Sequence, residues 1–304
     1  MKLHEDNIKF IDAINETNKI TNVDRSLIEK DYYLTLFLKE AKNRIPGLLF
    51  KGGTSLSKWY HIIDRFSEDI DLTLDVEHFH QSNKRKSVKT LIEICDDLGL
   101  KLLNREQVEK HTHGIYNCLK IEYPIVFKSN LIEQMLIVEM TYIQKTYPSA
   151  NKMIISMVGE TISNINNEIA KTYELDAFEI QTQSLERTFI DKVFALCDYY
   201  ISNRTIRNSR HIYDLYKISK EIDINSYIFK KLVDEVRTER KSNKTCYSAQ
   251  EGTNINNLLS EIITKQFFKN DFEQKTIGLL NCDISYEEII VVLNQIISSN
   301  SFAN

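Results

Sequence analysis

Two carboxylates separated by a single residue, Asp69 and Asp71, have the residue types and the spacing that most directly suggest chemistry in this chain. The surrounding residues 67–72 alternate polar and aliphatic side chains, which is typical of a half-buried β-strand. Side chains two apart on a strand point to the same face, roughly 7 Å apart, so these carboxylates would share one face. Because like charges repel, we expect a cation between them. Mg²⁺ or Mn²⁺, hard ions that prefer oxygen ligands, would suit that position.

A glycine turn precedes this strand in the sequence. Gly52 and Gly53, which follow an apolar run, allow a backbone to approach a ligand closely. Thr54 and Ser55 offer hydroxyl and backbone N–H groups near the start of a helix predicted over residues 56–63, where anions bind well. Asp-x-Asp and Gly-Gly each also occur by chance, on solvated strands and in common turns. Their order and close spacing predict a nucleoside triphosphate bound through its phosphates by the turn and by a metal on the strand.

The composition sets limits on the class of protein. A length of 304 residues predicts one large or two modest domains, and 42% hydrophobic residues are enough for a sizeable core. No apolar run reaches membrane-spanning length. The first residues are charged and amphipathic, unlike a signal peptide. We therefore expect a cytoplasmic protein without a membrane segment.

Other polar groups give weaker indications. The five cysteines are scattered without a Cys-x-x-Cys motif, which predicts reduced, mostly buried thiols. His111 and His113 lack acidic or cysteine partners at ligand spacing and are predicted to lie in a loop. With a net charge of −4, any RNA binding needs a local basic patch. The runs 203–210 and 237–244 are candidates, but solvated loops with a few arginines explain them equally well.

The periodicity of the chain predicts an α/β domain over residues 1–184 and a helical domain over residues 185–304. Eight glycines and three prolines suit a helix-rich chain. Asp24 is the predicted N-cap of the second helix. The predicted helices cover residues 5–18, 24–42, 84–98, 156–173, 186–200 and 209–220, the last with Ser209 as N-cap. The predicted strands cover residues 67–72, 101–104, 117–127, 133–143 and 178–183, and residues 48–50 form a short apolar run.

Two polar residues in the helical half need an explanation. Lys192 falls inside the apolar arc of its helix, and a buried lysine is costly unless its ammonium finds an anion or reaches water. It could open onto a phosphate-filled cleft or extend along apolar surface to the solvent. Asp214 lies away from the apolar side of its own helix, so periodicity predicts a surface residue paired with Arg210 one turn earlier.

Four segments of the chain together resemble one known family. They are the run KGGTSLSKWYHIIDRFSEDIDL at residues 51–72, Glu-Lys-Asp-Tyr at 29–32, Arg-Thr-Phe-Ile-Asp-Lys at 187–192 and Arg-His-Ile-Tyr-Asp-Leu-Tyr at 210–216. Their types and order resemble the polymerase-β-like nucleotidyltransferases, and specifically the AbiEii/AbiGii toxin branch. The resemblance extends over about residues 25–220. It implies an α/β (α+β) nucleotidyltransferase-fold domain with a mixed sheet, followed by a helical domain that completes the active-site cleft.

The resemblance also implies roles for individual residues. It places the divalent metal on Asp69 and Asp71, and it implies that Lys192 neutralises the triphosphate. Asp214 would orient Lys192 or contact the base or ribose. Glu139 is the best-placed third carboxylate, and Glu122 is a weaker rival. The nucleotide-binding residues implied by the matching segments are Lys51, Gly52, Gly53, Thr54, Ser55, Arg65 and Ser67.

For the triplet Glu29-Lys30-Asp31, composition alone favours a solvated helical turn, whereas the resemblance favours a structural role beside the active site.

The function implied by the resemblance is transfer of a nucleoside monophosphate from an NTP to an acceptor hydroxyl. RNA, at the 3′ end of tRNA, is the first acceptor expected and protein the second. The chain would be the toxin of a toxin–antitoxin or phage-defence system, with a cognate antitoxin as partner. Two other classes stay open: an NTP-binding module that acts by sequestration or partner binding without transfer, and a nuclease that uses the same acid pair.

Overall fold

The computed structural model describes residues 1–58, 60, 62–65, 67, 69–75, 80–110, 116–129, 132–142, 148–280 and 282–303. The chain divides into two compact units, one formed by Met1–Trp59 with Glu68–Thr182 and the other by Tyr60–Ser67 with Gln183–Asn304. The second unit therefore includes a short segment from the first half of the chain, which the predicted ranges 1–184 and 185–304 assign to the first domain. The predicted loop at His111 and His113 lies outside the described residues.

The first unit is built on a mixed sheet. In the described part of the chain the sheet has seven strands in the order β3-β4-β5-β2-β1-β7-β6. β2 pairs with β1 antiparallel and with β5 parallel, which confirms the predicted mixed sheet. The strands are β1 (Leu48–Lys51), β2 (Asp69–Leu74), β3 (Lys101–Leu102), β4 (Tyr116–Glu122), β5 (Leu136–Thr141), β6 (Ser149–Ile154) and β7 (Phe178–Gln183).

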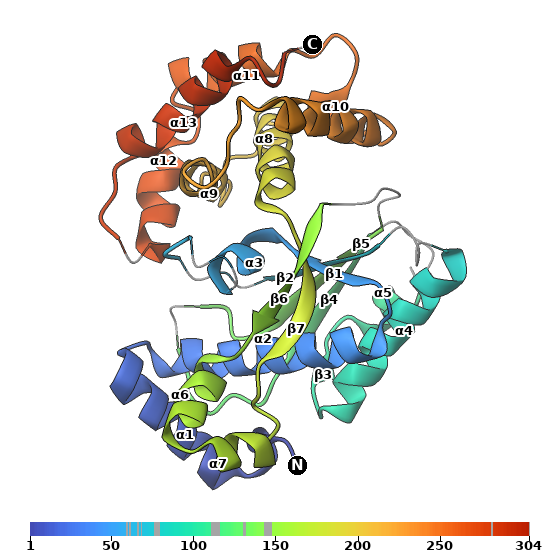
Figure 1. Ribbon diagram of the computed structural model, residues 1–304, viewed down its shortest axis with the longest axis vertical. Helices are drawn as coiled ribbons and strands as arrows, with labels where there is room; N and C mark the ends of the chain where they lie inside the picture. Colours follow the sequence, from blue (N-terminus) through green and yellow to red (C-terminus); the bar gives the residue numbers. More distant parts are fainter. Residues whose placement is uncertain are drawn as a thin grey trace. The chain divides into compact units, whose positions relative to one another are not determined.

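Helices cover one face of this sheet, because alternate residues of each strand are apolar and need to be buried. The buried cluster joins Phe50, Leu72 and Val138 of the sheet to Ile28 and Phe37 of α2. Figure 1 shows α2 passing across the sheet, with α1, α6 and α7 near one end of it and α4 near the other. The helices of this unit are η1 (Leu3–Glu5), α1 (Asn7–Thr21), α2 (Arg25–Arg44), α3 (Gly52–Lys58), α4 (Gln81–Asp97), α5 (Arg105–Lys110), α6 (Met157–Ile165) and α7 (Asn167–Thr172).

Most predicted elements are present with shifted ends. Asp24 caps α2, because its carboxylate accepts the Ser26 backbone N–H at 2.9 Å. The helix predicted over residues 56–63 is wrong in position, since α3 begins at Gly52 and ends at Lys58. The strands predicted to reach residues 104 and 127 end at 102 and 122. The short elements α5 and β6 were not predicted.

The first two residues of the triplet on α2 fix the connection between β4 and β5. Glu29 is fully buried, and its carboxylate accepts the backbone N–H groups of Val126 at 2.8 Å and Phe127 at 3.1 Å. Lys30 donates to the carbonyl of Glu133 at 2.7 Å. The solvated turn favoured by composition is therefore wrong. When a helix is covered on its polar side as well as on its apolar side, its charged side chains become buried. Their burial is tolerated where backbone groups hydrogen-bond to them.

The third residue of the triplet holds α3 in place. Asp31 forms a buried ion pair with Lys58, the last residue of α3, and accepts the backbone N–H of Met157 at 2.8 Å. Lys58 also donates to the hydroxyl of Thr35 at 2.8 Å. This one carboxylate therefore joins α2 to α3 and to the start of α6.

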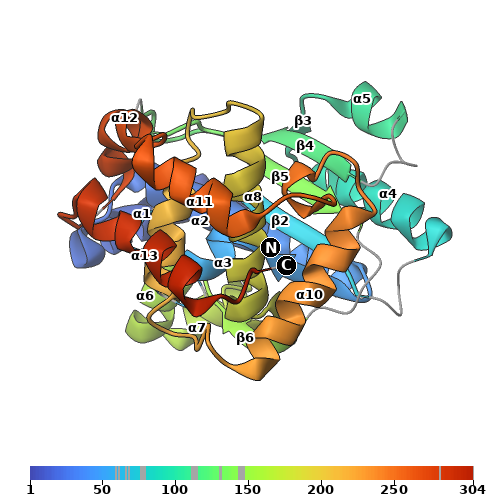
Figure 2. The same cartoon turned by 90° about the horizontal axis from the view of Figure 1, so that it is seen from above.

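The second unit is helical and centred on α8. α8 packs against α9, α10, α11 and η2 (Figure 2). Its described helices are α8 (Leu185–Ile201), α9 (Arg210–Ile218), α10 (Tyr227–Lys241), η2 (Tyr247–Ala249), α11 (Ile255–Thr264), α12 (Lys269–Asp271), η3 (Phe272–Thr276), η4 (Ile277–Leu279) and α13 (Tyr286–Ser299). Among the described residues, no helix is long and apolar enough to cross a membrane.

Charged residues of α8 and α10 form one network. Arg187 contacts Asp191 at 3.1 Å and Glu239 at 2.9 Å, and Arg240 contacts Asp191 at 3.2 Å and Asp198 at 3.4 Å. Each of these charged side chains has one of opposite charge beside it. Ion pairs therefore hold α10 to α8 in addition to apolar contacts.

Asp31→Asn should destabilise the first unit by about 3 kcal/mol, because Lys58 would remain buried without its counter-charge. Urea unfolding followed by circular dichroism measures this loss. Asp12→Asn, an exposed position on α1, serves as the control and should unfold like the wild type. Equal unfolding of the two variants would show that the Asp31–Lys58 pair does not hold α3.

Candidate active site

The two carboxylates of β2 share one face of the sheet, as predicted. Asp69 and Asp71 are half-buried, whereas Ile70 and Leu72 between and beside them are fully buried among the core side chains. The acidic face is therefore the face opposite to α2 and α4. Only the alternation of the strand is needed to place the two acids together.

Strand pairing adds three residues to this face. Asp71 lies opposite Lys51 of β1 and opposite Glu139 of β5, and Glu139 lies opposite Cys118 of β4. We call Lys51, Asp71, Glu139 and Cys118 the carboxylate row. Glu139 therefore neighbours Asp71 in register. The rival Glu122 lies at the other end of β4, within 3.5 Å of Lys101.

The glycine turn contacts this row through its backbone. Gly52 has a φ of 78°, and a Cβ atom there would lie 1.8 Å from Oδ2 of Asp71. The position thus requires glycine both for its conformation and for space. The buried hydroxyl of Thr54 donates to the carbonyl of Asp69, and that of Ser55 donates to the carbonyl of Gly52 at 2.7 Å. The Thr54 hydroxyl therefore holds the turn against β2, and the Ser55 hydroxyl stabilises the turn itself.

The acidic face provides donors suited to a divalent ion. Among the described residues, no group of three or more His, Cys, Asp or Glu side chains is arranged to hold a metal. Mg²⁺, however, is usually held by one or two carboxylates, with waters and substrate phosphates completing its shell. Asp69 and Asp71 on one strand face fit that mode of binding.

A second polar centre lies within the helical unit. Asp214 is fully buried and accepts two hydrogen bonds from Arg65, from Nε at 2.8 Å and Nη2 at 2.7 Å. Nζ of Lys192 donates to the same carboxylate at 2.7 Å. Burial alone would raise the pKa of Asp214, but the charges and hydrogen bonds of Arg65 and Lys192 lower it well below its usual value. Asp214 is therefore an anion shared by two cations.

The structure corrects one prediction here and confirms another. Asp214 is not a surface residue paired with Arg210, because Arg65 and Lys192 approach the side of α9 that periodicity assigned to solvent. Lys192 lies in the buried arc of α8 and has found an anion, as its position requires. The expected nucleotide-binding residue Arg65 directs two of its donors to Asp214, and Ser67 is buried. Ser209 occupies the N-cap position of α9 as predicted, but its hydroxyl donates to Asp271 at 2.7 Å and makes no capping hydrogen bond to the helix.

His211 is a neighbour of this centre that the sequence did not single out by itself. Its ring lies 5.3 Å from that of Tyr199, and its buried Nδ1 has no hydrogen-bond partner among the described residues. Burial lowers the pKa of His211 well below its usual value, and the charges of Lys192 and Arg210 lower it further. The imidazole is therefore neutral at pH 7. It adds no positive charge beside Lys192.

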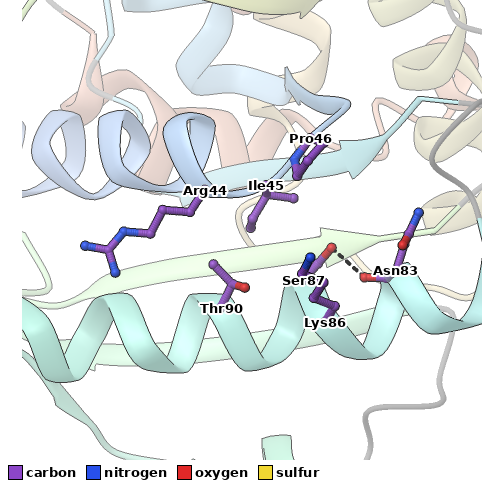
Figure 3. Close-up of a pocket in the computed structure, with 7 residues that line it drawn as sticks. All are labelled: Arg44, Ile45, Pro46, Asn83, Lys86, Ser87 and Thr90. Atoms are coloured by element: carbon purple, nitrogen blue, oxygen red, sulfur yellow. Dashed lines mark hydrogen bonds between the residues drawn. The ribbon is translucent and has the colours of Figure 1, made fainter.

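Two further features complete the comparison with the predictions. All five cysteines are free, but only Cys95 and Cys197 are fully buried, so the expectation of mostly buried thiols is wrong. A pocket of about 170 Å³ lies between the end of α2 and α4 (Figure 3). Since α2 and α4 cover the opposite face of the sheet, this pocket is separate from the carboxylate row. Its lining residues are Arg44, Ile45, Pro46, Asn83, Lys86, Ser87 and Thr90.

Comparisons with known proteins agree with this architecture. A sequence model of the family described as nucleotidyl transferase AbiEii toxin, Type IV TA system, matches residues 37–281. The solved structure of MenT4, a nucleotidyltransferase toxin from Mycobacterium tuberculosis, has a TM-score of 0.58 at 14% identity and covers 92% of this chain and 85% of its own. A Helicobacter pylori protein has a TM-score of 0.50 at 15% identity, with 91% and 95% covered. No curated protein matches the chain in sequence.

Asp214→Asn should lower the stability of the helical unit by about 3–5 kcal/mol at pH 7, because two buried cations lose their anion. The depressed pKa of Asp214 means that its charge stabilises the fold above about pH 4 and that this contribution is lost as the pH falls further. The stability difference between wild type and variant should therefore shrink in acid. Urea unfolding between pH 3 and pH 7 measures it, with the exposed Asp234→Asn as control. A difference independent of pH would contradict the assignment.

Gly52→Ala should abolish NTP binding, because the new methyl group would displace the Asp71 carboxylate. Gly99→Ala is a matched control, since Gly99 also has a positive φ, 65°, but has nothing within 4 Å of the added Cβ. Both variants should lose roughly 1–2 kcal/mol from backbone strain. Titration with a fluorescent NTP analogue distinguishes them, and retained binding in Gly52→Ala would overturn the role of this turn.

Proposed function

Because the chain belongs to the AbiEii nucleotidyl transferase toxin family of type IV toxin–antitoxin systems, we propose that it transfers a nucleoside monophosphate from an NTP to an acceptor hydroxyl. The acceptor oxygen forms a bond to the α-phosphorus, the bond from that phosphorus to the bridging oxygen breaks, and pyrophosphate leaves. The hydroxyl proton passes to a base. The observation that carries the proposal is the carboxylate row in direct contact with the backbone of Gly52.

The first unit supplies the groups that surround the α-phosphate in this proposal. Backbone N–H groups of the turn at residues 52–55 hold phosphate oxygens. Asp69 and Asp71 hold Mg²⁺ or Mn²⁺, which when bound neutralises phosphate charge and orients the reacting oxygens. Glu139, beside Asp71 in the row, accepts the proton of the acceptor hydroxyl. Lys51, at the other end of the row, adds a positive charge near the phosphates.

The helical unit contributes Lys192 in this proposal. Lys192 neutralises negative charge on the triphosphate as pyrophosphate departs. Asp214 fixes the position of its ammonium group, and Arg65 stabilises Asp214 as an anion. Only three residues separate Arg65 from Asp69 in the sequence, so one short segment connects the buried ion pair to the metal-binding strand.

The proposed acceptor is RNA, with the 3′ end of tRNA first and protein second. Support comes from the run 203–210, which exposes Arg204 and Arg207. The guanidinium of Arg204 lies 5.1 Å from the centre of the Tyr199 ring, and cation–aromatic groups of this kind are suited to phosphate and base contacts. Asp271 anchors the run by accepting the backbone N–H of Arg207 at 2.8 Å. A toxin of this family is expected to have a cognate antitoxin, and phage defence is the proposed biological setting.

The proposal is tested by incubating the protein with each α-labelled NTP, Mg²⁺ and total tRNA. We expect label in RNA together with pyrophosphate release. Asp69→Asn and Asp71→Asn should each reduce labelling by about 100-fold or more, because charge neutralisation at the transferring phosphate is lost. Glu122→Gln, on the same sheet but paired with Lys101, should label RNA like the wild type.

A sizing gel of the treated tRNA separates the alternatives. Extended RNA supports transfer, shortened RNA indicates a nuclease, and unchanged RNA with bound NTP indicates a binding module without transfer. Undiminished labelling in both aspartate variants would refute the assigned roles of Asp69 and Asp71.

A further inference from the structure

A tyrosine at the start of β4 contacts the proposed base. The hydroxyl of Tyr116 donates a hydrogen bond to Oε1 of Glu139 at 2.9 Å. Tyr116 lies two residues before Cys118, and Cys118 is the residue directly opposite Glu139. Side chains two apart on a strand share a face. Tyr116 therefore lies on the same face as the carboxylate row, diagonally across from Glu139.

This contact is not required for packing. Tyr116 is 47% exposed, so its hydroxyl could be satisfied by water if Glu139 were absent. Within the described part of the chain, the Tyr116 hydroxyl is the one hydrogen-bond donor to Glu139, and it leaves Oε2 for another partner. A glutamate side chain otherwise keeps considerable rotamer freedom on an open face. The hydrogen bond therefore selects one position of the carboxylate.

We propose that Tyr116 is a positioning residue for Glu139. By holding Oε1, it fixes one position of the carboxylate and leaves Oε2 to accept the proton of the acceptor hydroxyl. This inference rests on the proposed nucleotidyl transfer, because it assigns Tyr116 a role in the proton-transfer step of that reaction.

The other charged and titratable groups on this face do not duplicate the hydrogen bond. Asp69 and Asp71 are like charges that repel the Glu139 carboxylate. Burial raises the pKa of Cys118, and the charges of Glu139 and Asp69 raise it further, so the thiol is neutral. Burial and then the charge of Glu139 also raise the pKa of Tyr116, so its hydroxyl remains a donor throughout the neutral range. The groups facing Glu139 from the neighbouring strands are Lys51 on β1, Asp69 and Asp71 on β2, and Tyr116, Cys118 and Lys120 on β4.

Tyr116→Phe removes the hydrogen bond and keeps the ring. Without the hydrogen bond the Glu139 carboxylate is no longer held in one position, so kcat should fall about tenfold, the size expected for one hydrogen bond to a charged group. KM for the NTP should stay within about twofold, because the contact is to the base and not to the phosphates. The measurement is the initial rate of pyrophosphate release against NTP concentration at pH 7, with saturating tRNA and Mg²⁺.

Tyr173→Phe is the matched control, because Tyr173 also donates to a carboxylate, that of Asp6 at 3.1 Å, but in the helical layer. Its kcat and KM should match those of the wild type. In a Glu139→Gln background, where the carboxylate that Tyr116 holds is already absent, adding Tyr116→Phe should lower kcat no further.

Three results are distinguishable. A loss of kcat in Tyr116→Phe that disappears in the Glu139→Gln background, with KM unchanged, supports the proposal. Equal kcat for Tyr116→Phe and wild type, or a loss that persists without Glu139, overturns it while the transfer reaction itself stands. A wild-type protein that releases no pyrophosphate with any NTP overturns the proposed function and this inference with it.

Discussion

The pairing of buried charges is the constraint on which both units of this structure depend. A charge removed from water is costly unless an opposite charge or hydrogen bonds compensate for it. In the helical unit, Asp214 is compensated by Arg65 and Lys192. In the first unit, Asp31 is compensated by Lys58. Each set of charges joins segments that are distant in sequence. The directional ion pairs therefore fix the positions of these segments more specifically than apolar packing alone would.

The sheet brings together the polar side chains of the candidate site in the first unit. β2 lies between β1 and β5, so that the alternation of one strand and the register of its two neighbours bring Lys51, Asp71 and Glu139 into one row. The turn at Gly52 then lies against Asp71 with no room for a side chain. Glu29 and Lys30 of α2 fix the connection that leads into β5, and Asp31 fixes the end of α3. A single turn of α2 therefore supports both sides of the row.

Local periodicity was sufficient to predict some of this arrangement. A period of two residues placed Asp69 and Asp71 on one face, and a period of 3.6 placed Lys192 in a buried arc that required an anion. The anionic partner of Lys192 was harder to predict from the sequence, because the helical period of 3.6 residues assigned Asp214 to the surface. The error arose because Arg65 belongs to a segment that packs with a unit more than a hundred residues later in the chain. Tertiary pairing of this kind leaves no periodic signal.

The triplet Glu29-Lys30-Asp31 on α2 shows the same limit of prediction from local sequence. Three consecutive charged residues are typical of a solvated turn, and only the backbone groups supplied by distant loops make their burial favourable. The strands of the sheet and the helical second half were predictable, because long strands and helices carry strong periodic patterns, whereas the directions of strand pairing leave no such pattern. The short elements α5 and β6 carry too few residues for a pattern to be recognised.

We propose that Asp69, Asp71 and the turn at Gly52 together bind a metal–NTP complex. A crystal structure with Mn²⁺ and a non-hydrolysable NTP analogue tests this most directly, because the anomalous signal of Mn²⁺ locates the ion independently of the protein. We expect a Mn²⁺ peak bonded to the carboxylates of Asp69 and Asp71, with phosphate oxygens against the backbone of residues 52–55. A nucleotide bound elsewhere, with no Mn²⁺ on these two carboxylates, would contradict it.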